Sequence, residues 1–171
     1  MSIPTSGTWN IDGVHSSVVF TLTHNVVATF RGSIHGVGGT LQDGVLSGEV
    51  AVENINIGLL QPFKQHLLSE DWFDAANHPT LSFRSTDIHS HPDGSVHAAG
   101  ELTIKGVTKP VSISGVVSGP RSVELGDGST AERLGLNLMT DIDRREFGMN
   151  SFAGADWDVT VEVTLQLAPA A

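Results

Sequence analysis

Histidine is the residue type in this chain that could most readily do chemistry. The sequence has eight histidines and no cysteine. His89 and His91 would share one face of a strand, and His97 follows a turn at residues 92–94. Three such side chains could bind zinc, but histidines at a polar hairpin tip are usually only solvated. We therefore expect no metal site.

Acid–base catalysis would need a histidine in an enclosed site, and His15, His24 and His66 are the candidates. Such residues are more often satisfied side chains of a core or pocket. The sequence contains no nucleophile elbow, no phosphate-binding glycine loop before a helix and no His-Glu-x-x-His. The sequence favours binding over catalysis. A small barrel enzyme that uses His24 or His66 as the acid or base on a lipophilic substrate is the alternative.

Cationic side chains could instead hold an anionic head group. Arg84, Arg144 and Arg145 could each bind phosphate through paired N–H donors, and His24 and His66 are further candidates. The alternative for each is ion pairing with some of the 19 Asp and Glu residues. The run 141–145, Asp-Ile-Asp-Arg-Arg, has the composition of a surface ion-pair cluster.

The net charge of −10 excludes some partners. Nucleic-acid binding needs clustered Lys and Arg, and so does attraction to an anionic membrane. No stretch approaches the roughly 18 apolar residues of a membrane span, so we expect no stable membrane insertion. The first residues show neither a basic n-region nor an apolar h-region. We therefore expect a cytoplasmic protein.

Strands must position most of these residues, because apolar and polar residues alternate along most of the chain. The alternation is cleanest at Val159, Val161, Val163, Leu165 and Leu167. The same period marks the segments 15–25, 30–41, 45–54, 80–89, 96–105, 110–118 and 134–142. The sequence thus predicts about eight strands of roughly ten residues each, longer than average.

Long antiparallel strands with one apolar face close most naturally into an up-and-down barrel. A β-sandwich is the alternative, although its strands are usually shorter and its turns more frequent. We expect a tight hairpin turn at residues 42–44, a polar loop at 119–130 and an irregular segment at 143–156. No linker divides the chain, so residues 1–171 form one all-β domain.

One segment departs from the strand pattern, and it is predicted to be a short helical insertion around residues 62–76. Phe63, His66 and Leu67 have the i, i+3, i+4 spacing of one helical face. The helix must end before Pro79, because the residue before a proline avoids the α conformation. We expect this segment to close or line one end of the barrel.

An eight-stranded barrel can be filled by side chains or can hold one ligand. Gly32, Gly48, Gly100 and Gly115 fall at positions expected to face inward, which favours a cavity. The alternative is that these glycines relieve strain where the sheet curls. The predicted ligand-binding residues are Phe20, Leu22, His24, Phe30, Phe63, His66, Leu67, Trp72, Phe73, Phe83, Arg84, Arg144 and Phe147.

Short motifs occur in a fixed order along nearly the whole chain. They are Trp9-x-Ile11-Asp12-x-x-His15-Ser16, Phe30-x-Gly32, His66-Leu67, Asp71-Trp72-Phe73-Asp74, His78-Pro79-Thr80-x-x-Phe83-x-Ser85, Gly100-x-Leu102-Thr103-Ile104-x-Gly106-Val107-Thr108-Lys109 and Arg144-x-Glu146-Phe147-Gly148. Each motif alone is weakly specific. In this order, the chain resembles the YceI-like, polyisoprenoid-binding family of lipocalin-like barrels.

The resemblance implies a single extended antiparallel eight-stranded lipocalin-like barrel that encloses an apolar tunnel. It also implies a ligand such as an isoprenoid quinone, a polyprenyl phosphate or another long amphipathic lipid, with no catalysis and no further cofactor. Relatives suggest a homodimer, although no long exposed apolar patch in this sequence demands one. Many relatives are exported, so this chain would belong to a cytoplasmic branch. Phe63 and Lys64 stand where the family usually has an Arg-Asp pair.

Overall fold

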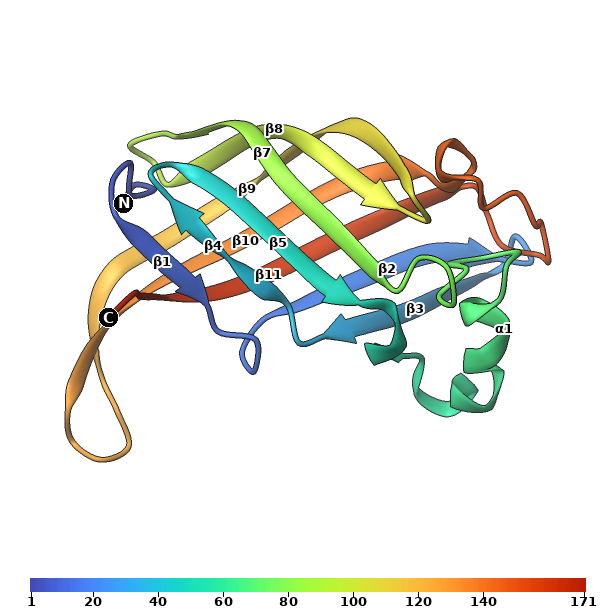
Figure 1. The fold of residues 1–171 in the computed structure, drawn as a ribbon, viewed down its shortest axis with the longest axis horizontal. Helices are drawn as coiled ribbons and strands as arrows, with labels where there is room; N and C mark the ends of the chain where they lie inside the picture. Colours follow the sequence, from blue (N-terminus) through green and yellow to red (C-terminus); the bar gives the residue numbers. More distant parts are fainter.

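The strands of this protein all belong to one antiparallel sheet, in a computed structural model that describes residues 1–171 (Figure 1). The strands are β1 (Thr8–Ile11), β2 (Ser17–His24), β3 (Ala28–His35), β4 (Gly38–Gln42), β5 (Val45–Ala51), β6 (Ile55–Asn56), β7 (Thr80–Ser90), β8 (Ser95–Ile104), β9 (Val107–Glu124), β10 (Thr130–Asp143) and β11 (Asp158–Pro169). The helical segments are η1 (Val52–Asn54), η2 (Gly58–Phe63), α1 (Lys64–Leu68) and η3 (Arg144–Phe147). None of them is long and apolar enough to cross a membrane.

The sheet closes into a barrel because its first and last strands pair. The order β1-β4-β5-β7-β8-β9-β10-β11 returns to its start through the pairing of Ile11 with Leu167. β2 pairs with β11 at residues 160–164, beyond the part that pairs with β1, so β1 and β2 share one strand position. β3 and β4 share the next position in the same way. The predicted eight-stranded antiparallel barrel is confirmed.

Glycines lie at the bends and turns that the sequence predicts. Between β3 and β4 the backbone of Gly36 has a φ of 80°, a left-handed conformation that favours glycine. The hairpin from β4 to β5 turns at Asp43 and Gly44, with φ values of 48° and 80°. Two successive left-handed residues match the twist of antiparallel strands, which confirms the predicted tight turn.

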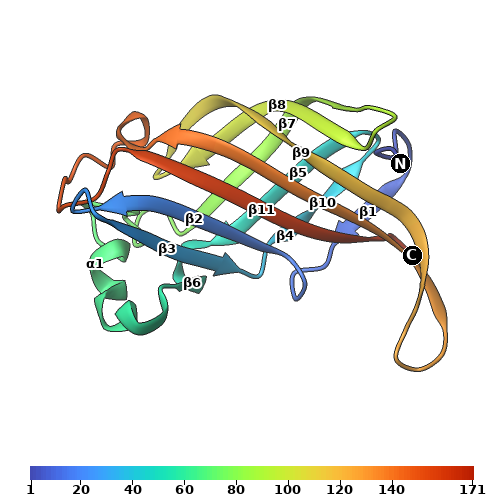
Figure 2. The same cartoon turned by 180° about the vertical axis from the view of Figure 1, so that it is seen from behind.

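The prediction of a polar loop at residues 119–130 is wrong. β9 continues to Glu124 and β10 begins at Thr130, and the two strands form a hairpin that projects from the barrel (Figure 2). A short turn suffices because the Leu125 N–H donates to the Ser129 carbonyl at 2.7 Å. The Gly119–Pro120 pair lies where the register of the two strands shifts, so the missing proline N–H interrupts no regular ladder.

The helical insertion differs from the predicted residues 62–76 in both of its ends. It spans Gly58–Leu68 as η2 followed by α1. It ends at Leu68 because Ser69 has an extended backbone, and the Ser69 hydroxyl donates to the His66 carbonyl at 2.6 Å. Serine often satisfies a nearby carbonyl in this manner and so competes with helix continuation. Turns at residues 69–77 then lead to β7.

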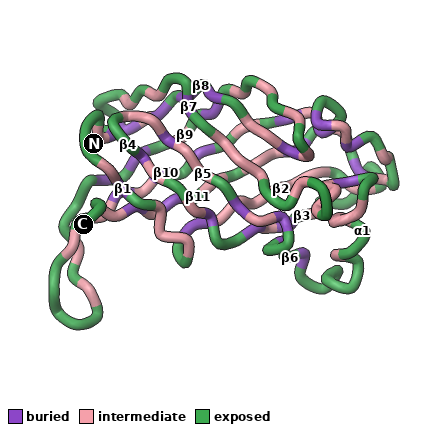
Figure 3. The backbone as a smooth tube through the Cα atoms, in the orientation of Figure 1, coloured by how far each residue is buried: buried purple, intermediate pink, exposed green.

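Completely buried leucines gather at one end of the barrel interior, and Figure 3 shows burial along the whole backbone. At the end with the chain termini, Leu41, Leu134, Leu136 and Leu167 are completely buried, and Trp9 packs with them. At the α1 end, many inward-facing side chains are only half-buried. The first end is a filled core, whereas the second end has open space inside the wall.

The inward glycines make room for aromatic rings and for neighbouring backbone. A Cβ on Gly32 would lie 2.3 Å from the Phe20 ring, and a Cβ on Gly100 would lie 2.5 Å from the Phe83 ring. Both rings therefore lie over a glycine of the neighbouring strand. We expect inward glycines to leave space inside the barrel, and at Gly32 and Gly100 aromatic rings occupy that space.

We expect Gly115→Ala to be destabilising, because its Cβ would lie 1.9 Å from the Asn137 carbonyl oxygen of the neighbouring strand. Backbone cannot move aside as a side chain can, so the free energy of unfolding should fall by about 2 kcal/mol. Denaturant titration measures this loss. Gly126→Ala is the matched control, because no atom lies within 4 Å of its Cβ position. Equal midpoints for the two variants would contradict the prediction.

Candidate functional site

The barrel encloses one large apolar cavity of about 600 Å³. Of the 39 residues that line it, 31 are hydrophobic. β11 contributes Val159, Val161, Val163 and Leu165, the same alternate positions that the sequence pattern placed on one face. A cavity of this size with an apolar lining has the usual dimensions of a small-molecule site.

The cavity reaches the surface at the α1 end, where the sheet is incomplete. β3 pairs with β6 only at Ser33 and Ile34, so residues 28–32 have no strand partner on that edge. α1 lies at this end of the barrel (Figure 1). The edge of β3 and the helical segments both line the cavity there, through Ala28, Thr29, Phe30, Leu60, Phe63, His66 and Leu67. These residues form the mouth of the cavity.

Eleven of the thirteen predicted ligand-binding residues line this cavity. They are Phe20, Leu22, His24, Phe30, Phe63, His66, Leu67, Trp72, Phe73, Phe83 and Arg144. Whether they contact a ligand remains a prediction. Phe20 and Phe30 also touch one another, with ring centroids 6.1 Å apart.

Arg84 does not line the cavity, so the structure corrects its predicted position. Adjacent residues of a strand point to opposite faces, and Phe83 takes the inward position. Arg84 is exposed on the outer wall, in a polar hollow that also contains Glu49 and Glu101. It lies directly opposite Glu101 in the pairing of β7 with β8.

Phe147 is also absent from the cavity lining. Its side chain is almost completely buried in a second apolar cluster beneath the 144–157 segment. Ile104, Ile142 and Met149 are buried in the same cluster. Phe147 therefore supports the wall at the α1 end and does not face the open space.

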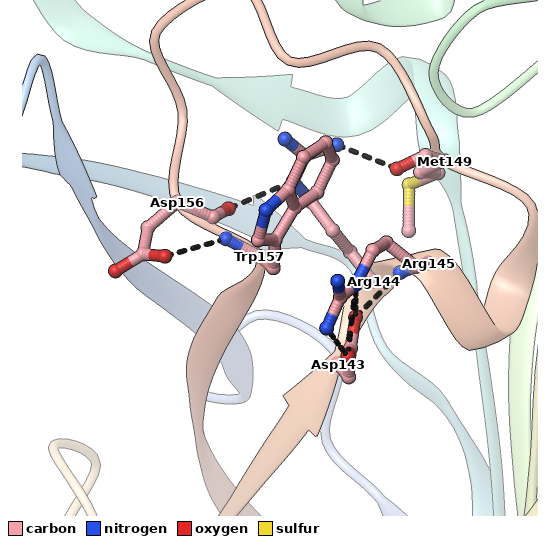
Figure 4. A network of polar contacts seen from close by, with 6 residues as sticks. All are labelled: Asp143, Arg144, Arg145, Met149, Asp156 and Trp157. Carbon is pink, nitrogen blue, oxygen red and sulfur yellow. Dashed lines mark hydrogen bonds and ion pairs between the residues drawn. The ribbon is translucent and has the colours of Figure 1, made fainter.

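Arg144 is the most unusual side chain of the site, because its guanidinium is buried without a carboxylate partner (Figure 4). Its Nε donates to the Asp156 carbonyl at 2.8 Å and its Nη2 to the Ala155 carbonyl at 2.8 Å. Nη1 donates to the Met149 carbonyl at 2.5 Å, and Nη2 lies 3.5 Å from the Phe152 carbonyl. One arginine thus satisfies backbone acceptors along the whole 149–156 loop.

Two tryptophans supply the other contacts of this cation. The guanidinium carbon lies 4.8 Å from the ring centroid of Trp72 and 4.4 Å from that of Trp157. Cations over indole faces are stabilised by the ring quadrupole, more so when water is excluded. Burial lowers the pKa of Arg144, and the nearby carboxylates of Asp143 and Asp156 oppose this change.

The predicted surface ion-pair cluster at residues 141–145 is correct for only one of its arginines. Arg145 is exposed, and its guanidinium binds both carboxylate oxygens of Asp143. Hydrogen bonds from Arg145 lower the pKa of Asp143 and the same contact raises the pKa of Arg145. Arg144 instead points inward, because η3 begins at that residue and places the two arginines on opposite sides.

His66 is tied to the rim of the cavity by a tryptophan. The indole Nε1–H of Trp72 donates to His66 Nε2 at 3.0 Å. Because an indole nitrogen can only donate, His66 Nε2 must be the acceptor, and any proton of the neutral ring is on Nδ1. His24 lies where its strand forms an isolated bridge with Ala155.

The remaining histidines lie outside the cavity. His15 is exposed, which corrects its predicted core or pocket position, and its Nδ1 lies 2.8 Å from Asp12 Oδ2. This contact lowers the pKa of Asp12. His91 and His97 have ring centroids 5.7 Å apart, while His89 pairs with Asp87. No group of three or more His, Cys, Asp or Glu residues is arranged to hold a metal ion.

Sequence reasoning missed Trp157, which packs on Arg144, and no pattern in the sequence indicated its role. It also left out most aliphatic residues of the cavity wall, such as Val18, Leu102 and Leu138. Their strand alternation was a sufficient signal. The aliphatic side chains form the larger part of the lining, and the aromatic residues the smaller part.

The fold and the cavity define a lipocalin-like barrel with an apolar interior open at one end. A model of the YceI-like domain matches residues 9–168. The chain belongs to this family, which confirms the resemblance drawn from the motifs.

Known relatives agree with this assignment. A UPF0312 protein of Pseudomonas syringae pv. tomato is 24% identical over 161 residues, which cover 91% of this chain and 82% of that protein. Among solved structures, a polyisoprenoid binding domain from Saccharophagus degradans aligns with a TM-score of 0.75 at 12% identity, over 95% of this chain and 98% of that one. BcnA of Burkholderia cenocepacia aligns with a TM-score of 0.70 at 18% identity, over 91% and 98%. At these identities the two structures establish the shared fold.

Proposed function

We propose that this protein binds a long-chain isoprenoid or a similar amphipathic lipid in its cavity, for storage or transport, and performs no chemistry on it. The observation that carries the proposal is the one-ended apolar cavity, packed shut at the terminal end and open beside α1. The solved relative described as a polyisoprenoid binding domain supports the same ligand class.

The position of the polar groups suggests how an amphipathic lipid would lie. His24, Thr29 and His66 line the α1 end of the cavity, whereas the inner end is lined by aliphatic residues such as Leu46 and Leu165. Polar groups near one end of an apolar pocket fix ligand orientation. The tail would therefore point inward and the head group would remain at the mouth.

The energetics of such a ligand depend on where it comes from. At about 0.8 kcal/mol per CH2-sized group, a forty-carbon tail would gain roughly 30 kcal/mol on leaving water. This exceeds the practical ceiling of about 18 to 21 kcal/mol for non-covalent affinity. The proper reference is a bilayer, in which the tail is already out of water, so that transfer into the cavity is close to neutral. Specificity must then come from cavity length and the polar mouth.

No observation favours the catalytic alternative. His66 Nε2 already accepts the Trp72 N–H, and Arg144 is engaged by backbone carbonyls. The family of this chain, as its solved polyisoprenoid-binding relative illustrates, supports a binding role. The cytoplasmic location and the homodimer stay predictions from the sequence.

The first test is extraction of freshly purified protein into organic solvent, followed by lipid mass spectrometry. We expect about one long-chain lipid per barrel. Addition of an isoprenoid quinone to delipidated protein should then raise the thermal midpoint, because a ligand that binds only the folded state stabilises it. An empty extract together with an unchanged midpoint for isoprenoid quinones and polyprenyl phosphates would refute the proposal.

A further inference from the structure

Exposed apolar side chains gather around the mouth of the cavity. Of ten large hydrophobic residues that are exposed, six lie at the α1 end. They come from the β2–β3 turn, from η2 and from the 149–157 loop, which Figure 1 shows at the same end of the barrel. We define them as the apolar rim: Val26, Val27, Leu59, Leu60, Phe63 and Phe152.

Two of these segments are joined to each other, and the third lines the cavity. The Asn25 N–H donates to the Gly154 carbonyl at 2.7 Å, which joins the β2–β3 turn to the loop that carries Phe152. Leu60 and Phe63 belong to the rim and also line the cavity. Through η2, apolar side chains therefore extend from the outside of the rim into the binding space.

The β2–β3 turn holds its apolar residues at a conformational cost. Val26 has a φ of 66°, in the left-handed region, where a β-branched residue is a rare outlier and Asn or Gly would fit without strain. Val26 and Val27 are each 88% exposed, and Leu59 is completely exposed. A turn that needed only to be stable would have polar residues or glycine at these positions.

We propose that the apolar rim docks on the surface of a lipid bilayer, so that the lipid tail passes between the bilayer and the cavity without crossing water. The inference rests on the proposed function, because a long-chain lipid resides in bilayers. Exposed apolar clusters of this kind mark interaction surfaces. A second copy of the chain on the same rim would instead cover both cavity mouths and block the ligand path.

The charges of the protein indicate which bilayer the rim fits. Its net charge of −10 opposes an anionic surface. Two lysines at this end are occupied by backbone, since Lys64 Nζ donates to the Glu53 carbonyl and Lys105 Nζ to the carbonyls of Glu70 and Gly148. Docking must therefore come from apolar insertion, and a zwitterionic bilayer is the expected partner. Such docking should be insensitive to salt, unlike binding between charges.

The test is flotation of the full chain with phosphatidylcholine vesicles. The rim variant combines Val26→Asn, Val27→Ser and Leu59→Ser, three positions that do not line the cavity. The matched control combines Val116→Ser and Met139→Ser, two side chains that are each 49% exposed on the outer wall. We expect the rim variant to bind vesicles about tenfold less than the wild type, and the control to bind normally at low and high salt.

Loading of an isoprenoid quinone from cyclodextrin separates this proposal from the proposed function. Equal uptake by the wild type and the rim variant, with weaker vesicle binding by the variant, supports docking. Three outcomes overturn docking: no vesicle binding by the wild type, binding only to anionic vesicles at low salt, or a rim variant that changes from dimer to monomer without altered vesicle binding. If neither the wild type nor the rim variant takes up the quinone, the proposed function is refuted. The flotation result still decides the docking proposal.

Discussion

Arg144→Met is expected to lower the free energy of unfolding by about 3 kcal/mol, because the carbonyls of Met149, Ala155 and Asp156 would lose their donor together. Methionine fills most of the same volume but has no N–H group. Arg144 as a whole is only 1% exposed, so water cannot easily replace its guanidinium. The loss should also loosen the 149–157 loop beside the cavity mouth. Denaturant titration and hydrogen exchange of the loop amides measure the two effects.

Arg145→Met is the matched control for this prediction. Its side chain is adjacent in sequence and of the same type, but it is exposed and pairs with Asp143 at the surface. Exposed ion pairs contribute little to stability, so the control should unfold close to the wild type. A similar loss for both variants would show that the buried carbonyl contacts of Arg144 are not the source of the effect.

Arg144→Lys adds a second check, since lysine retains the charge. A single ammonium cannot reproduce the fork of donors that reaches separate carbonyls. If the charge over Trp72 and Trp157 were the main contribution, lysine would rescue stability. We expect it to recover only a small part.

The strand pattern favoured a barrel over a sandwich, because the strands are long and their alternating residues give each of them one apolar face. The same rule explains one error in the predicted site. Phe83 and Arg84 are neighbours on β7 and cannot both face inward. The aromatic ring occupies the inside over Gly100, and the arginine lies on the outer wall.

The role of Arg144 could not be predicted from local pattern. Its partners are the carbonyls of a loop five to twelve residues later in the chain, whose course is set by tertiary packing. Residues 141–145 hold two aspartates followed by two arginines, a composition typical of exposed segments, and only η3 turns one of the arginines inward. The helical insertion shows a similar limit, because the Ser69 hydroxyl ends the helix at a point that apolar spacing does not mark.

Val161→Trp should reduce binding of a long-chain isoprenoid by about a hundredfold or more while the barrel remains folded. Val161 lines the cavity between Phe20 of β2 and Thr140 of β10, its partners in the sheet. The indole would occupy the passage from the mouth to the inner end, where the tail must lie. The cavity of about 600 Å³ has space for the larger ring, so the cost in stability should stay within about 1 to 3 kcal/mol.

Glu162→Trp places the same indole one residue later, on the exposed outer face of β11, and serves as the control. Titration with an isoprenoid quinone delivered from cyclodextrin compares the two variants, and circular dichroism checks their fold. A short isoprenoid alcohol should still bind to Val161→Trp, because only the inner part of the cavity is blocked. Undiminished binding of the long chain by a folded Val161→Trp protein would mean that the lipid does not lie within the barrel, and the apolar interior would then need another explanation.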